Sequence, residues 1–269
     1  MIQEQSRFQY GLTGNTIKII GVVMMIFDHL HQMFHVQGVP LWFGWIGRPV
    51  LPIFVFLCAE GFAYTRSRKR YLLQLFIGFE FMNIVSEVLS LTMWNEDVIL
   101  INNVFQTLLL AALYMLFIEI LRSGIREKQA GKITAAVLLM LLPIAVGIGF
   151  LLIIESGTRW MFMVFRLIPN IFATEGGFTA ILMGIVFYLL RKHRLWQVAA
   201  FAVICVLSLV MFLKAGNSPL SGSAQWLMIF ALVPIVLYNG QRGKGSKYFF
   251  YIFYPVHIYA LYIIAWFMR

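Results

Sequence analysis

The amino-acid sequence predicts an all-α protein, a polytopic integral membrane helical bundle of about nine to ten transmembrane helices that forms one domain over residues 1–269. Hydrophobic residues make up 61% of the chain and charged residues 12%, roughly half the charged share of a soluble domain. Apolar segments long enough to cross a bilayer also recur along the chain between short polar loops. Together these observations exclude an ordinary soluble enzyme.

Nine apolar segments account for the predicted spans, because each approaches the length that the hydrocarbon core of a membrane requires. In chain order they cover residues 16–36, 41–65, 71–93, 100–121, 133–154, 177–190, 196–213, 224–239 and 248–267. Residues 159–175 are only moderately apolar and contain Arg159, Arg166 and Pro169. We interpret this stretch as interfacial or re-entrant on the outer side of the membrane. If it crossed the membrane instead, there would be ten spans.

Basic residues cluster at alternate ends of these spans and set the direction of the chain by the positive-inside rule. The clusters follow the second, fourth and sixth spans and precede the last, at residues 66–70, 122–132, 191–194 and 242–247. The loops at 33–41 and 94–99 contain no Lys or Arg. We therefore expect a cytoplasmic N-terminus and an outer C-terminus. The formal net charge of +10 reflects this topology, so no nucleic-acid partner is expected.

The first span carries Asp28 and His29 within an apolar sequence. Ionisable side chains inside hydrocarbon are costly, and they mark functional sites by default. Lys18 and His29 are eleven residues apart, which puts them on one face of a helix, about 16 Å apart along its axis. A cation low on this face and an imidazole high on it indicate a ligand that runs along the helix. The alternative is that His29 only packs between helices through a hydrogen bond.

Several motifs are spread over nearly the whole chain. They are Lys18 through His29, Gly47-Arg48-Pro49, Ala59-Glu60-Gly61-Phe62, Asn102-Asn103-Val104-Phe105 and Phe253-Tyr254-Pro255-Val256-His257. Together they resemble the TraX family of bacterial membrane proteins, named for a conjugation protein that acetylates the N-terminus of a pilin subunit. The chain is also distantly similar to integral-membrane acyltransferases, which carry an Arg and a His in their first helix; Lys18 and His29 occupy those positions. The resemblance implies an acetyl-CoA-dependent transferase of the bacterial cytoplasmic (inner) membrane.

Acetyl transfer from a thioester needs a base for the acceptor's proton and a hydrogen-bond donor for the developing oxyanion. His29 is the candidate base, and His257 in the last span is a second catalytic candidate. Arg48 and Asn103 lie at a similar predicted depth and are candidate oxyanion donors. Asp28 is either catalytic or structural, because adjacent side chains of a helix diverge by about 100°. Its expected partners are Gln32, His31, His257 or Arg48.

Basic and polar residues near the predicted cytoplasmic mouth form the expected donor site. Cations of this kind make charge-assisted contacts with phosphates such as those of coenzyme A, although topology alone also explains the cluster. The expected cofactor-binding residues are Lys18, Glu60, Tyr64, Arg66, Arg68 and Arg70. Asp28, His31 and His35 share a helix face at a spacing that suits zinc, but the sequence offers no further ligand, so no metal is expected.

These residues predict a membrane-embedded acetyltransferase that moves an acetyl group from cytoplasmic acetyl-CoA to an amine or hydroxyl acceptor at the membrane. The resemblance implies a peptide or pilin N-terminus as the acceptor, and a glycan-type or lipid-linked hydroxyl remains open. A proton-coupled small-molecule transporter would use similar intramembrane residues. A non-catalytic membrane assembly protein is the other alternative. Acetyl-CoA hydrolysis or transfer by the purified protein separates the enzyme from both.

Overall fold

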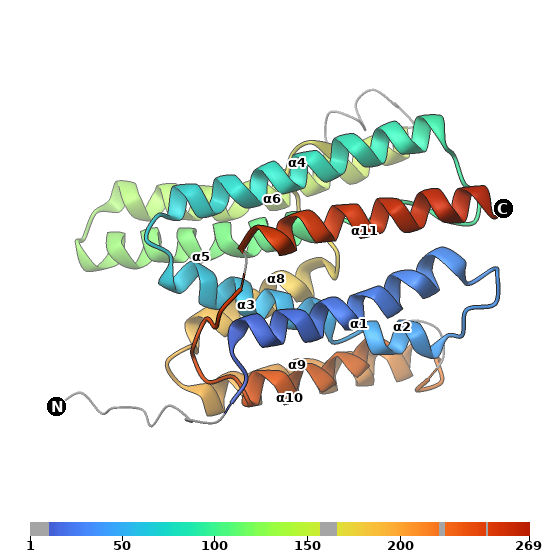
Figure 1. Ribbon diagram of the computed structural model, residues 1–269. Coiled ribbons are helices and arrows are strands. Elements are labelled where there is room, and N and C mark those ends of the chain that lie inside the picture. The colour runs from blue at the N-terminus through green and yellow to red at the C-terminus, as the bar shows by residue number, and fades with distance from the viewer. Residues whose placement is uncertain (1–10, 157–165, 221–223, 246) are drawn as a thin grey trace. The chain divides into compact units, whose positions relative to one another are not determined.

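The computed structural model describes residues 11–156, 166–220, 224–245 and 247–269. Helices joined by loops make up this part of the chain (Figure 1), and it contains no β-strand, so the predicted all-α class is confirmed. The chain gathers into two compact units. The first unit comprises Met1–Leu57, Ser90–Leu100 and Leu190–Arg269, and the second comprises Cys58–Leu89 and Ile101–Leu189. That the whole chain is one domain remains a prediction.

The helices divide between the two units. The first unit holds α1 (Gly14–Phe34), α2 (Trp42–Gly47), α9 (Arg194–Lys214), the 3₁₀ helix η1 (Gln225–Ala231), α10 (Leu232–Val236) and α11 (Lys247–Phe267). The second unit holds α5 (Val104–Arg126), α6 (Ala130–Ser156) and α8 (Gly177–Leu189). Two helices contribute residues to both units, α3 (Val50–Tyr64) and α4 (Arg68–Thr92).

Seven helical segments of the described chain are long and apolar enough to cross a membrane, which identifies a helical membrane protein. They are Gly14–Phe34, Trp42–Tyr64, Arg68–Thr92, Val104–Arg126, Ala130–Ile153, Arg194–Lys214 and Tyr248–Phe267, and each overlaps a predicted span. The other two predicted spans correspond to the shorter apolar helices Gly177–Leu189 and Gln225–Val236. The predicted count of nine to ten is therefore not confirmed, although a helix occurs at all nine predicted positions.

The predicted re-entrant stretch, 159–175, lies partly outside the described residues. Where the description resumes, residues 167–176 are not helical. Non-helical backbone at membrane depth is tolerated where protein buries it and supplies its hydrogen bonds. Two side-chain amides of the second unit do so, Asn83 donating to the carbonyl of Arg166 (3.0 Å) and Gln106 to that of Asn170 (3.2 Å). The geometry of this part supports a segment docked against α4 and α5.

In the first unit, α1 packs against α2 and runs parallel to α11 (Figure 1). Near the beginnings of both helices, the Nζ atom of Lys18 lies 5.1 Å from the ring centroid of Phe250. Farther along both, His29 contacts His257. The first and last predicted spans therefore run in the same direction.

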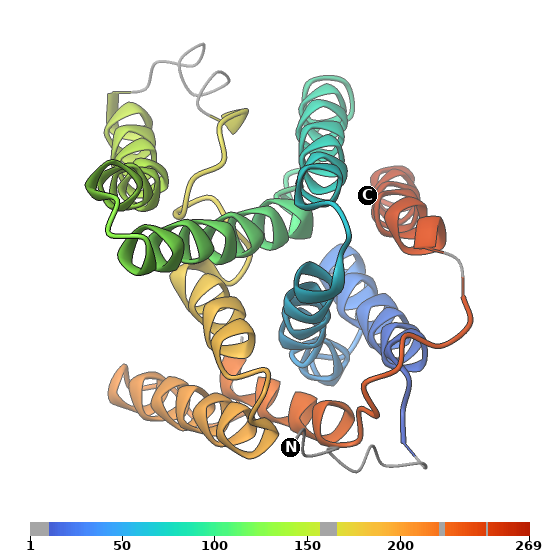
Figure 2. The same cartoon turned by 90° about the vertical axis from the view of Figure 1, so that its left-hand side faces the viewer.

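In the second unit, α5 packs against both α6 and α8 (Figure 2). Its apolar face forms a buried cluster with residues of α8 and of the non-helical segment: Leu110, Tyr114, Phe117, Ile171 and Ile181. The Tyr114 hydroxyl donates to the Met140 carbonyl on α6 at 2.8 Å. This packing fixes α5, and α5 carries one of the predicted site residues, Asn103, at its N-terminal cap.

Labelling of single cysteine variants tests the topology. We expect cysteines at three basic-loop positions to react only from the cytoplasmic side, and cysteines at three other loop or terminal positions only from the outside, because basic loops stay on the cytoplasmic side. The first set is Arg126, Lys192 and Lys244, and the second is Glu96, Asn217 and Arg269. Arg269 bonds to the carbonyl of Trp94, so Glu96 and Arg269 must label from one side. Labelling of these two positions from opposite sides would contradict this contact and the predicted outer C-terminus.

Candidate functional site

Two histidines from opposite ends of the chain form the centre of the candidate site in the first unit. His29 on α1 is buried, and its Nδ1 atom lies 2.7 Å from Nε2 of His257 on α11. The two imidazole rings stack with their centroids 4.9 Å apart. The structure thus joins the two histidines that the sequence offered as separate catalytic candidates.

The hydrogen bonds of His257 determine which nitrogen carries each proton. Nδ1 of His257 lies 2.8 Å from the backbone carbonyl oxygen of Phe253, and a carbonyl only accepts, so this nitrogen must donate. Nε2 of neutral His257 is then an acceptor, and Nδ1 of His29 donates to it. In this assignment the second nitrogen of neutral His29, Nε2, is unprotonated. It is the atom that can take a proton.

His257 reaches a backbone carbonyl of its own helix because Phe253 precedes it by four residues, about one turn of α11. Pro255 lies between them inside α11. The Phe253 ring stacks on the His257 ring with centroids 4.7 Å apart and an interplanar angle of 14°. Tyr254 presents its ring edge-on to both histidines, 6.3 Å from His29 and 5.9 Å from His257. Consecutive residues of α11 therefore hold His257 in one orientation.

Lys18 and His29 occupy the same face of α1, as the sequence predicts. Both face α11, since Lys18 lies over the Phe250 ring and His29 bonds to His257. Their separation along the helix axis is about 16 Å. The first unit therefore presents a cation and a hydrogen-bonded imidazole pair at two levels of the contact between α1 and α11.

Asp28 faces α2 instead of His29. A Cβ atom added at Gly47 would overlap the Asp28 side chain, which shows how closely α2 approaches α1. The side chains that interact electrostatically with Asp28 are those of Arg48 and His31. Both were among the partners of Asp28 that the sequence predicted. The residue consequently belongs to the contact between α1 and α2, and it does not orient its neighbour.

Arg48 forms a polar site at the end of α2. Its Nη1 atom donates to Oε1 of Gln225 at 3.4 Å. Within the described part of the chain, Nε of Arg48 and Nε1 of Trp45 are buried donors that have no acceptor. They are three residues apart, a spacing that puts two side chains on one helix face. Buried donors of this kind require an acceptor from outside the described part of the chain, such as water or a ligand.

A comparison with protein families gives a match along nearly the whole chain. The family model described as TraX protein matches residues 13–265, which includes α1, Arg48 and the α11 motif. The chain belongs to the TraX family. Comparisons with curated proteins and with solved structures give no significant match. Among the motifs shared with the TraX family, 253–257 now has a physical explanation, because it fixes the position and the tautomer of His257.

The other predicted catalytic residue of this TraX-family chain, Asn103, is in the second unit and has a structural role there. Its Oδ1 atom caps α5 by accepting from the backbone N–H of Gln106. Its Nδ2 group donates to the carbonyl of Phe79 (3.1 Å) and to Oδ1 of Asn83 (3.0 Å). Both amide hydrogens are used, so none remains for an oxyanion. The geometry corrects the prediction that Asn103 serves as an oxyanion donor.

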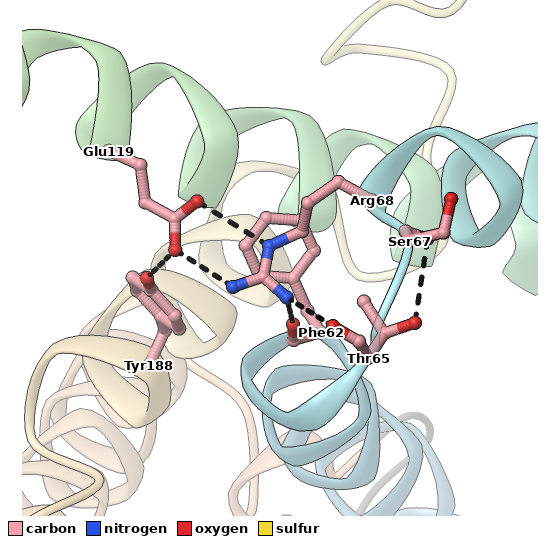
Figure 3. Close-up of polar contacts among 6 residues, drawn as sticks. All are labelled: Phe62, Thr65, Ser67, Arg68, Glu119 and Tyr188. Carbon is pink, nitrogen blue, oxygen red and sulfur yellow. Dashed lines mark hydrogen bonds and ion pairs between the residues drawn. The ribbon is translucent and has the colours of Figure 1, made fainter.

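Arg68, predicted to bind the donor, is held within the second unit (Figure 3). Its Nη2 atom lies 3.1 Å from Oε1 of Glu119, and Tyr188 donates to the same oxygen at 2.5 Å. The guanidinium also donates to the carbonyls of Phe62 and Thr65, and it stacks over the Phe62 ring at 4.4 Å. Arg68 therefore connects the end of α3 to α5 and α8, and these contacts compete with a phosphate role.

The remaining donor-site predictions also fall in the second unit, around the turn between α3 and α4. Tyr64 is 79% exposed, Arg66 and Arg70 are exposed, and Glu60 is buried. Their role in binding a donor stays a prediction. Within the described residues, no group of three or more His, Cys, Asp or Glu could hold a metal ion. Among the three residues whose spacing suits zinc, Asp28, His31 and His35, His31 has a backbone partner: its Nδ1 donates to the carbonyl of Val39 at 3.1 Å.

Several contributors to the site were not predicted from the sequence. Phe253 acts through its backbone carbonyl, and the identity of a residue does not reveal such a role. Trp45 and Gln225 lie within apolar sequence, so neither was singled out as a polar contributor. One available signal was Pro255, because a proline inside a predicted span marks disturbed backbone hydrogen bonding next to a candidate histidine. Another was Gly47, since a glycine in a span marks close approach of backbones.

Substituting Gly47 by alanine tests the contact between α1 and α2. The added methyl group overlaps Asp28, and such overpacking lowers the free energy of unfolding by about 1–3 kcal/mol. Thermal unfolding in detergent measures the loss. Gly131→Ala is the matched control, because nothing lies within 4 Å of a Cβ at Gly131. Equal unfolding temperatures for both variants and the parent would show that α2 does not pack on Asp28 in this way.

Proposed function

We propose that this TraX-family protein is an acetyltransferase of the bacterial inner membrane that uses cytoplasmic acetyl-CoA. The acceptor is an amine or hydroxyl presented at the membrane, and a peptide or pilin N-terminus is the acceptor that the family suggests. The single observation that carries the proposal is the hydrogen-bonded pair of the buried His29 and the half-buried His257, with its fixed tautomers. A histidine whose lone pair is directed by a second group is the usual arrangement for a general base.

The chemistry assigns a defined task to each nitrogen of the pair. The acceptor's nitrogen or oxygen attacks the thioester carbonyl carbon while Nε2 of His29 removes its proton. The bond between carbon and sulfur then breaks, and coenzyme A leaves as a thiolate that takes up a proton, either from the His29 imidazolium or from water. His257 accepts the Nδ1 hydrogen bond from His29 throughout, and this stabilises the positive charge that His29 acquires. His29 is thus the catalytic residue, and His257 is a positioning residue.

The developing oxyanion needs a donor, and Arg48 is the residue that we retain for this task. It has a buried Nε hydrogen without an acceptor in the described chain, whereas Asn103 has no hydrogen left to give. A preorganised donor of this kind is worth about 10²–10³-fold in rate in other enzymes of acyl transfer. Asp28 balances the Arg48 charge from α1 and has no direct part in the reaction.

The donor enters from the cytoplasmic end of α1, and Lys18 lies on the route to His29. Its position on the α11 face of α1 suits a thioester that extends along the contact between the two helices. In the second unit, Arg66 and Arg70 remain proposed contacts of the donor because their positive charge attracts phosphates. Glu60 and Tyr64 remain proposed polar contacts around the same turn between α3 and α4. Arg68 supports that region through Glu119 and Tyr188.

Release of coenzyme A by the purified full chain tests the proposal. The protein is reconstituted in lipid nanodiscs with acetyl-CoA and a peptide that has a free N-terminal amine. We expect thiol release that depends on His29, with acetylation of the peptide N-terminus detected by mass spectrometry. A protein that binds no acetyl-CoA and releases no thiol, but carries protons in vesicles through the same histidines, would be a transporter instead.

A further inference from the structure

A glycine-rich loop, residues 239–245, wraps around the N-terminal turn of α1 in the first unit. We name it the strap. Hydrogen bonds fix its backbone to the beginning of α1 and to the residue Leu12 before it: from Asn239 N to Leu12 O (3.0 Å), from Gly14 N to Gln241 O (2.8 Å) and from Asn15 N to Arg242 O (2.9 Å). The Asn239 side chain donates to the carbonyl of Gly11 and accepts from Gln241 N within the strap. The strap therefore has a defined position and already supplies acceptors for the first N–H groups of α1.

The glycines of the strap are needed for this conformation. Gly240 and Gly243 have φ angles of +77° and +74°, in the region where side chains are disfavoured. A Cβ atom at Gly243 would also overlap Thr13, and one at Gly245 would overlap the Asn15 amide. A loop that served only to keep positive charge on one side of the membrane would not require such close packing. The strap is built to hold its backbone and its side chains in place.

The strap carries two exposed cations, Arg242 and Lys244. The carboxylates of the first unit within the described residues are Asp28, Glu96 and Asp97. Asp28 lies about 20 Å farther along α1, and the loop containing Glu96 and Asp97 meets the opposite end of α11 through Arg269 and Trp94. The described part of the first unit therefore provides no carboxylate beside the strap to neutralise these cations.

The strap lies at the beginning of the face that leads to His29. A Cβ atom on Gly14 would lie 3.6 Å from the carbonyl oxygens of both Gln241 and Arg242, so this side of α1 faces the strap. Lys18 follows Gly14 by four residues and projects over the same side of the helix. The strap and Lys18 thus form one cationic end of the contact between α1 and α11, and the two histidines lie at its other end.

We infer that the strap is a phosphate-binding site, with Arg242 and Lys244 as the charged ligands, held in place by the packing of the strap on the beginning of α1. Arg and Lys side chains make charge-assisted hydrogen bonds to phosphate oxygens. The ligand is elongated, because its reacting carbon must reach His29 about 20 Å from the first turn of α1. This inference rests on the proposed function for its donor, and it assigns the phosphates of the acyl-CoA to the strap.

Binding of coenzyme A to the intact protein tests the inference. The full chain is placed in nanodiscs of zwitterionic lipid, and its Kd for coenzyme A is measured by calorimetry. The double variant Arg242→Gln, Lys244→Gln should weaken binding by about 10-fold or more, since two charge-assisted contacts are lost. Arg126→Gln, Lys128→Gln is the matched control, because it removes the same charge with the same spacing from an exposed loop of the second unit. It should leave Kd unchanged.

A second arm separates the two sources of phosphate. Retention of phosphatidylglycerol by each variant is measured by native mass spectrometry. Weaker coenzyme A binding in the strap variant alone supports the site and assigns it to the donor. Loss of retained phosphatidylglycerol in the strap variant alone supports a phosphate site that holds a lipid headgroup. If neither ligand depends on Arg242 and Lys244, the inference is overturned, whatever acetyl transfer the protein shows. Absence of transfer despite strap-dependent binding would reject only the proposed reaction.

Discussion

Replacing His29 by alanine is expected to lower acetyl transfer by about 10²-fold or more, the usual loss on removal of a general base. The phosphate end of the path should be unaffected, because Lys18 and the strap lie at the other end of α1. We therefore expect the Kd for coenzyme A to stay unchanged while the turnover number falls. Thiol release and calorimetry on the same nanodisc preparation measure both quantities.

His31→Ala is the matched control for this prediction. His31 lies two residues farther along α1 and donates to the Val39 carbonyl, which turns it away from His257. Its substitution should change transfer only slightly. If His29→Ala retains full activity while His257→Ala abolishes it, the base is on α11 and our assignment of roles is reversed. If both variants remain fully active, the histidine pair takes no part in the reaction.

The second large effect concerns His257, which acts through His29. His257→Ala should lower the turnover number by about 10-fold or more, because it removes the acceptor that fixes the His29 tautomer and stabilises the imidazolium. His257→Gln should recover part of the loss. A glutamine amide has an oxygen that can accept from Nδ1 of His29 and an N–H group that can donate to the Phe253 carbonyl.

The pH profile of the turnover number distinguishes positioning from simple packing. If His257 acts by accepting from Nδ1 of His29, the pH profile of the glutamine variant should keep the shape of the parent's profile, and its turnover number should lie between those of the alanine variant and the parent. Equal loss of turnover in both variants would mean that His257 only fills space.

The sequence alone determined where the helices occur and which face of α1 matters. Uninterrupted apolar runs must become helices in a membrane, because no other local structure satisfies their backbone groups. The eleven-residue spacing of Lys18 and His29 then put both on one side of α1, and this was confirmed because both face α11. Regular helical geometry carries such information within one element. The apolar pattern does not predict the structure of residues 159–175, where it is broken. It also does not predict that two of the nine expected spans are shorter helices.

Only the tertiary structure decided which side chains meet. His29 and His257 are 228 residues apart, and nothing in either helix encodes that α1 and α11 are neighbours. The direction of Asp28 depends on the close approach of α2 at Gly47. The amide of Asn103 is used up because buried donors must find acceptors wherever the fold provides them, here Phe79 and Asn83. The packing of the helices decides which side chains meet. A single sequence specifies the residue types but does not reveal their neighbours in the fold.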